Sequence, residues 1–203
     1  MLDLDPLDEA LSDALARGDL TEFNRLGEIA DRQAAQREAR LSSTGALAAA
    51  ALWYAGRGVA VFPLQPGDKK PYPGSRGFKD ATTDKATVRE WWAFRPNSNI
   101  GLPTGLLFDV IDIDGELGSR SLVRLRQEGA VPTVYGHAAT ARPCGAHLYI
   151  AATGDGNGSA LWPGIDYRGK GGYVVAPPSV VTGGRRYDWL YPLDLDALGA
   201  ARV

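Results

Sequence analysis

Two aspartates on an otherwise apolar stretch are the residues whose types and spacing most plainly suggest chemistry. Leu106–Asp114 reads Leu-Leu-Phe-Asp-Val-Ile-Asp-Ile-Asp between two glycines, which is typical of a strand covered on both faces. Because strand side chains alternate, Asp112 and Asp114 project to the same side. Neighbouring carboxylates repel each other unless a cation compensates, and Mg²⁺ or Mn²⁺ prefers oxygen ligands. The pattern favours a metal site for phosphoryl transfer; the alternative is a strand end whose side chains reach solvent before a turn at Gly115.

Later segments carry residues that suit the same chemistry. Alternation places Asp166 and Arg168 on one face of a predicted strand, where they can meet metal and phosphate respectively. We expect the glycines that follow to form a tight hairpin with a returning strand over 173–176. His147 begins another predicted strand; a lone histidine is more often structural, but a turn-strand junction favours a functional role. Lys69 lies on a predicted loop, where plain solvation is the commoner alternative to phosphate binding.

Periodicity and capping residues predict the elements that position these side chains. Helices are expected over 5–18, from Asp19 onward, from a cap at Ser42 or Ser43 to Gly56, from Thr82–Asp84 to Pro96, and from Ser119 to Gly129 with Leu122, Val123 and Leu125 inward. Strands are expected over 59–64, 106–114, 133–140, 147–151, 165–168, 173–176 and 185–189. This order predicts a helical appendage over 1–42, a compact domain over 43–193 and a tail over 194–203.

Two further segments leave alternatives open. Trp91 and Trp92 could stack on bases, but at helical spacing paired tryptophans more often anchor a core, and we expect core positions. The loop over 154–159 is rich in Gly, Asp and Asn, and we identify no chemistry in it.

The composition excludes several classes of protein. The chain has 203 residues, 44% hydrophobic and 23% charged, which is typical of one substantial globular core with at most a small appendage. A net charge of −2 and a pI near 5.7 argue against binding nucleic acid mainly through overall charge. The single cysteine, Cys144, excludes an intrachain disulfide and a multi-cysteine zinc site. Because the N-terminus is acidic and no apolar run reaches membrane length, we expect a cytoplasmic protein without a membrane partner.

The motifs together resemble a known family. From about Leu47 to Trp189 the chain is similar to the primase-polymerase (Prim-Pol) domain of bifunctional replication proteins, a branch of the archaeo-eukaryotic primase superfamily found in plasmids, phages and prophages. The similar motifs are, in order, GVAVFPLQPGDKKP, FKDATTD, NIGLPTG, VIDIDG, HLYI, GIDYRGKGGYVVAPPS and YDW. One motif departs from the family, because Cys144 stands where Gly-Gly-x-His often has its first glycine. That change could restrict the turn before His147.

The resemblance implies a fold and a set of site residues. The expected fold is α/β (α+β), an α/β unit packed beside an RRM-like sheet with the active site between them. By similarity, the metal-binding and catalytic acids are Asp112, Asp114 and Asp166, and the nucleotide-binding residues are His147, Arg168, Lys69 and Ser179. The implied reaction is nucleotidyl transfer with Mg²⁺ or Mn²⁺ and no zinc, in which His147 and Arg168 neutralise charge on the phosphates.

The resemblance also implies partners, and it leaves rival functions open. The partners would be a single-stranded DNA template with its primer, dNTPs or rNTPs, and a replicative helicase, fused or separate, since this sequence contains no P-loop motif. One rival is a catalytically weak single-stranded DNA or origin-binding module. We expect the acids to argue against it, because without metal nothing would stabilise three clustered carboxylates. The other rival, a metal-dependent nuclease, would not release pyrophosphate.

Overall fold

The computed structural model describes residues 10, 14, 17, 19–183 and 185–200, without the side chains of residues 20, 23 and 30–44. Contacts divide the chain into two compact units, 1–44 and 45–203. The helix predicted over 5–18 lies almost wholly outside the described residues. None of the helices in the described part of the chain is both long and apolar enough to cross a membrane.

Helix α2 (Leu20–Gly56) is one continuous element, so the predicted helix start at Ser42 or Ser43 is wrong. The segment around these serines contains no proline and is rich in alanine, the strongest helix former, so nothing interrupts the backbone ladder. The predicted cap at Asp19 is confirmed, because its Oδ1 accepts a hydrogen bond from the backbone N–H of Glu22 at 3.0 Å. In the second unit, the end of α2 contributes Leu47, Ala51, Tyr54 and Ala55 to the core.

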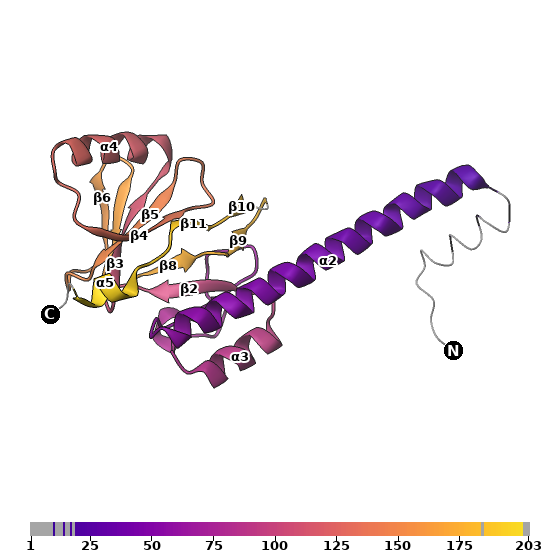
Figure 1. Cartoon of the computed structure of the whole chain (residues 1–203), viewed down its shortest axis with the longest axis horizontal. Helices are drawn as coiled ribbons and strands as arrows, with labels where there is room; N and C mark the ends of the chain where they lie inside the picture. The colour runs from indigo at the N-terminus through magenta and orange to yellow at the C-terminus, as the bar shows by residue number, and fades with distance from the viewer. Residues whose placement is uncertain (1–9, 11–13, 15–16, 18, 184, 201–203) are drawn as a thin grey trace. The chain divides into compact units, whose positions relative to one another are not determined.

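Two antiparallel sheets form most of the second unit (Figure 1). The smaller sheet has the order β1-β2-β8, formed by Phe62–Leu64, Asn99–Pro103 and Tyr173–Ala176. The larger has the order β11-β4-β5-β3-β7-β6, formed by Asp188–Tyr191, Val134–Ala139, Ala146–Ala151, Phe108–Ile113, Ile165–Arg168 and Gly158–Trp162. β9 (Val180–Val181) and β10 (Arg185–Arg186) pair separately. The remaining helices are the 3₁₀ helix η1 (Gly77–Asp80), α3 (Lys85–Phe94), α4 (Gly115–Gln127) and α5 (Leu195–Ala200).

Helix α4 covers one face of the larger sheet (Figure 1). β3 and β4 both run antiparallel to β5 between them, so β3, α4 and β4 form a split βαβ unit, as in RRM-like sheets. Leu122 and Leu125 of α4 pack on Ile113, Leu148 and Ile165 of the sheet. The structure confirms the expected α+β class.

The predicted details of α4 need two corrections. The helix begins directly after β3 with Asp114 as its N-cap, and Ser119 lies inside it, where its hydroxyl donates to the carbonyl of Cys144 at 2.8 Å. Val123 is 54% exposed instead of inward, because the stripe that faces the sheet is narrower than the run of apolar residues. By contrast, the predicted cap of α3 is confirmed, since Asp84 accepts from the backbone N–H groups of Ala86 and Thr87.

The predicted hairpin after Arg168 is wrong. β7 pairs with β3 and β6, whereas β8 pairs with β2, so the glycine-rich segment 169–172 carries the chain from one sheet to the other. Thr104 anchors this crossing, because its hydroxyl donates to the carbonyl of Gly169 at 2.6 Å and its N–H to that of Gly172 at 3.0 Å. The strand predicted over 185–189 is likewise divided between β10 and β11. The crossing over 169–172 links the larger sheet to the smaller one at a shared boundary.

Candidate active site

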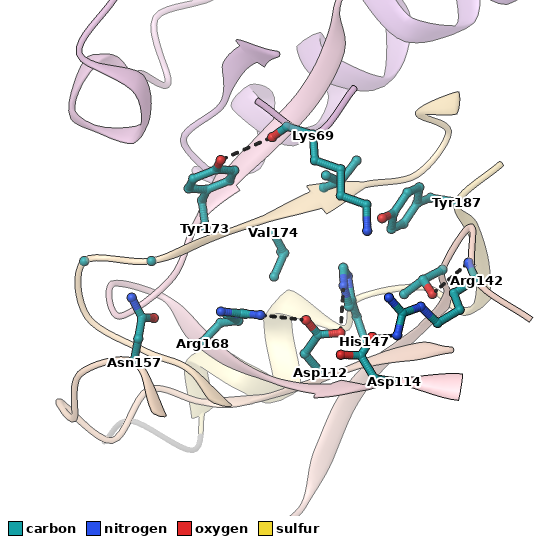
Figure 2. Close-up of a pocket in the computed structure, with 14 residues that line it drawn as sticks. Lys69, Asp112, Asp114, Arg142, His147, Asn157, Arg168, Tyr173, Val174 and Tyr187 are labelled. Atoms are coloured by element: carbon teal, nitrogen blue, oxygen red, sulfur yellow. Dashed lines mark hydrogen bonds and ion pairs between the residues drawn. The ribbon is translucent and has the colours of Figure 1, made fainter. Parts of the chain in front are cut away.

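A pocket with a volume of about 340 Å³ lies where the two sheets meet, and it is called the first pocket here. The larger sheet supplies acids and bases from β3, β5 and β7, and the smaller sheet supplies β8 and the loop that carries Lys69 (Figure 2). Phe108 and Val110 lie on the same face of β3 as Asp112, but they are buried in the core with Leu102 and Val174. The charged end of that face is therefore the part left open to the pocket.

Arg168 lies between two of the predicted metal-binding acids. Asp112 and Asp166 are directly opposite each other on β3 and β7. The Nη2 atom of Arg168 donates to Asp166 Oδ2 at 2.9 Å and to Asp112 Oδ2 at 3.2 Å. The other oxygen of Asp166 accepts from the backbone N–H of Ala160 at 2.9 Å. One guanidinium thus holds both carboxylates in place.

This arginine does not fully compensate Asp112, whose side chain is only 17% exposed. Burial raises the pKa of the Asp112 carboxyl, and the opposing effect of the Arg168 guanidinium is smaller. Repulsion from Asp166 raises this pKa further. The buried carboxylate therefore still favours the approach of another cation.

The third acid, Asp114, has a separate partner. Its Oδ1 forms an ion pair with Arg142 Nη1 at 3.0 Å, and its side chain makes no capping hydrogen bond to α4. Both side chains line the pocket (Figure 2). Asp112 and Asp114 share one side of the pocket, as the strand alternation predicted.

His147 is neutral in this structure. It is 5% exposed, and burial lowers its pKa to about 3, with the positive charges of Lys69 and Arg168 acting in the same direction. Its Nε2 lies 3.6 Å from Asp112 Oδ1, which is too long for a hydrogen bond, and a neutral ring makes no salt bridge. Its Nδ1 has no hydrogen-bond partner among the described residues. With no nucleotide bound, His147 is thus a neutral hydrogen-bonding group, and charge neutralisation by it on the phosphates stays a prediction.

The smaller sheet supplies the opposite wall. Tyr173 donates from its hydroxyl to the backbone carbonyl of Lys69 at 3.2 Å, and the Lys69 side chain extends toward the acids (Figure 2). The centre of the Tyr187 ring lies 5.6 Å from the centre of the His147 ring. Burial raises the pKa of the Tyr187 phenol to about 12. Both tyrosines are therefore neutral hydrogen-bonding groups near neutral pH.

Two predicted site residues do not line this pocket. Ser179 is fully buried, and its hydroxyl accepts from the backbone N–H of Ile100 at 2.9 Å, so it ties the end of β8 to β2. Asp166 reaches the pocket only through its contact with Arg168.

Two other residues that line the pocket, Asn157 and Arg142, were not predicted from the sequence. Asn157 comes from the loop to which no chemistry was assigned, and its Oδ1 accepts from the backbone N–H of Gly169 at 3.1 Å. Arg142 lies in a turn that carries no recognisable phosphate-binding pattern. No local signal distinguishes either residue, because both reach the pocket only through long-range strand pairing.

The three carboxylates are ligands of the type that a divalent ion prefers, but they are not arranged around a common ion position. In the part of the chain that the structure describes, no three Asp, Glu, His or Cys side chains form a metal-binding group. Arg168 and Arg142 are paired with the acids instead. The incompletely compensated carboxylate of Asp112 and its opposition to Asp166 are nevertheless what a hard cation requires.

Comparison with known families gives one match that covers well over half of the chain. The family described as bifunctional DNA primase/polymerase, N-terminal (Prim-Pol), matches residues 51–200. This range contains every residue that lines the pocket. A comparison with curated proteins finds no match.

Proposed function

Because the chain belongs to the Prim-Pol family of bifunctional DNA primase/polymerase N-terminal domains, we propose that its pocket performs template-directed nucleotidyl transfer. Primase/polymerase-type nucleotidyl transfer is what the family implies, and its enzymes generally use divalent metal ions. The observation that carries the proposal is the meeting of Asp112 and Asp114 with Lys69 and Arg168 in one pocket. Acids for a metal and cations for a triphosphate are thus within reach of the same bound molecule.

In this proposal Asp112, Asp114 and Asp166 hold Mg²⁺ or Mn²⁺. Such an ion, when bound, lowers the pKa of the attacking hydroxyl and stabilises the leaving group. The primer 3′-hydroxyl loses its proton to water, and its oxygen forms a bond to the α-phosphorus. The bond from that phosphorus to the oxygen shared with the β-phosphate breaks, and pyrophosphate leaves. Lys69 binds phosphate oxygens through its ammonium group, and His147 donates one hydrogen bond as a neutral ring.

Arg168 has two roles in this proposal. Without nucleotide, its guanidinium holds Asp112 and Asp166 at 3.2 and 2.9 Å. A triphosphate offers the same planar group a set of oxygens that it can bind in a bidentate manner. We infer that Arg168 turns from the acids to the phosphates on nucleotide binding. Ser179, whose hydroxyl is engaged with the N–H of Ile100, supports β8 instead of contacting the nucleotide.

The wider setting of the reaction rests on the family alone. We propose a single-stranded DNA template with its primer, dNTPs or rNTPs as substrates, and a role in plasmid, phage or prophage replication beside a fused or separate helicase. Release of pyrophosphate separates this reaction from that of a nuclease.

One observation favours a second candidate, the catalytically weak single-stranded DNA-binding module. All three acids are paired with arginines without any metal. The three carboxylates are therefore stabilised by arginines, and the expectation that only a metal would stabilise them is wrong. The same pairing is compatible with a fold that has kept its acids and lost activity.

Primer extension separates the two candidates. The assay uses a labelled primer on a single-stranded template with dNTPs and Mn²⁺ or Mg²⁺. We expect the natural chain to extend the primer, Asp112→Asn to lose about 10²-fold or more in rate, and a chelator to stop the reaction. Asp188→Asn is the matched control, because Asp188 is exposed, lies on β11 and does not line the pocket.

Equal extension by the Asp112→Asn variant would show that the chemistry lies elsewhere. Absence of extension by the natural chain, with single-strand binding intact, would support the binding module.

A further inference from the structure

We propose that a second pocket, formed by β1, α3 and the segment 72–80, is a stacking site for an unpaired base of single-stranded nucleic acid. This inference rests on the proposed function, because it concerns how the template strand is held beside the active site. The pocket has a volume of about 520 Å³ and is called the aromatic pocket here. Its principal lining residues are Phe62, Tyr72, Arg76, Trp91, Phe94 and Arg95.

Aromatic side chains are available on this surface. Phe94 is 80% exposed at the end of α3, although burying a phenyl ring is favourable. The two neighbouring tryptophans have different environments. Trp92 is 3% exposed, and its Nε1 donates a hydrogen bond to the carbonyl of Ser98. Trp91 is half-buried and lines the pocket. The expectation that both are core anchors is confirmed, because Trp92 is buried in the core and Trp91 packs against it with the part of its ring that does not line the pocket. Phe94 and Trp91 present ring surface on which a flat base can stack.

The charge of the aromatic pocket suits a polyanion. The guanidinium carbon of Arg95 lies 3.9 Å from the centre of the Tyr72 ring, which is held in place by a 2.8 Å hydrogen bond between its hydroxyl and Ser98 Oγ. Arg95 has no ion-pair partner within the described part of the chain, whereas the pocket's one acid, Asp80, is paired with Arg76 at 2.6 Å. An uncompensated cation beside exposed rings is the combination that holds a phosphate and its base.

The aromatic pocket adjoins the candidate active site across the smaller sheet. Phe62 lines the aromatic pocket, and Tyr173 lines the first pocket. The centres of their two rings lie 5.3 Å apart. The ring of Phe62 can cross β2 because residue 101 is glycine; a Cβ there would overlap it. Since β1 and β8 flank β2, the strands that carry Phe62 and Tyr173 lie about 10 Å apart across the sheet. A short run of single strand can therefore span both.

Binding of single-stranded DNA, measured without metal and without nucleotide, tests this inference. The probe is a short, fluorescently labelled oligothymidylate, followed by fluorescence anisotropy against the full chain. We expect Phe94→Ala and Arg95→Ala each to raise the dissociation constant about fivefold or more, as the loss of one stacked base does. Matched controls are Tyr191→Ala, which removes another exposed ring at 70% exposure, and Arg185→Ala, which removes an exposed arginine of β10.

An oligonucleotide of the same length with abasic sites distinguishes base stacking from general charge. The natural chain should bind it more weakly, and Phe94→Ala should cause no additional loss, because no base remains to stack. Circular dichroism and thermal melting of each variant confirm that the fold is intact. The inference is overturned if Phe94→Ala and Arg95→Ala bind oligothymidylate like the natural chain, or if the two controls lose as much affinity.

The outcomes are separable from those of the proposed function. A chain that extends primers but shows no effect of Phe94→Ala on binding keeps the function and loses this inference. A chain that extends no primer but needs Phe94 to bind oligothymidylate keeps the inference and loses the polymerase activity.

Discussion

At the scale of single residues, Arg168 decides the state of the acid cluster. Its Nη2 atom lies within 3.2 Å of Asp112 and 2.9 Å of Asp166, so it compensates two carboxylates on adjacent strands. A guanidinium in this position competes with any divalent ion for the same oxygens. The arginine therefore compensates these acids in part, and it occupies oxygens that a divalent ion could bind.

Replacing this arginine should make metal binding visible in protein stability. We expect Arg168→Gln to lower the melting temperature without metal, since the loss of one partner from a half-buried cluster costs about 1–3 kcal/mol. Millimolar Mn²⁺ should then raise the melting temperature of Arg168→Gln more than that of the natural chain, because the ion no longer competes with the guanidinium. Differential scanning fluorimetry with and without Mn²⁺ measures both effects.

Arg120→Gln is the control for this measurement. Arg120 is 76% exposed, and among the described residues its ion pair is with Glu116 of its own helix. Equal Mn²⁺ shifts in all three proteins would show that the ion does not bind at Asp112 and Asp166.

At the scale of elements, the close approach of α4 to the larger sheet positions β3. α4 follows β3 directly, so the helix and the strand that carries Asp112 move together. The contact depends on Gly118, where a Cβ would overlap the carbonyl oxygen of Gly164 in the turn before β7. Both strands that carry the opposed acids are thus braced by one helix contact.

We expect Gly118→Ala to destabilise the fold by about 1–3 kcal/mol, the usual cost of forcing an atom into a packed contact. Gly45→Ala is the matched control, because Gly45 is also helical and a Cβ there meets no atom within 4 Å. Alanine favours helix, so that control should be neutral or stabilised by up to about 1 kcal/mol. Urea unfolding followed by circular dichroism measures both; a Gly118→Ala variant as stable as the control would contradict the packing argument.

At the scale of the whole molecule, the site lies entirely within the unit 45–203. Among the described side chains of α2, Leu47, Ala51 and Tyr54 of its last turns belong to the core of that unit. The family match begins at residue 51, inside the same part of the helix. The described part of α2 that contributes to the core of this unit therefore begins at Leu47.

A chain that begins at residue 41 should fold and keep its pocket. We expect its melting temperature to stay within about 4 °C of the full chain, which corresponds to about 1 kcal/mol for a protein of this size. A chain that begins at residue 57 is the control, because it lacks Leu47, Ala51 and Tyr54 and should lose cooperative unfolding. Failure of the longer chain to fold would show that the first unit is needed for the second.

The sequence by itself determined the parts of this protein that depend on neighbours along the chain. Strand alternation placed Asp112 and Asp114 on one side, where both line the pocket, and short-range capping identified the helix starts at Asp19 and Asp84. Such patterns are decided within a few residues, so a single sequence contains them. The order of the motifs over about Leu47 to Trp189 was likewise sufficient to identify the family, whose model matches residues 51–200.

Only the tertiary structure decided which distant residues meet. The glycines after β7 suit a hairpin, but pairing of β8 with β2 carries the chain into the other sheet. The same crossing draws Ser179 into the core and brings Asn157 to the pocket, although neither position differs locally from an ordinary turn or loop. The pairing of Arg168 with two acids required β3 and β7 to be adjacent and in register. Strand pairing depends on the packing of the whole domain, and no local pattern encodes it.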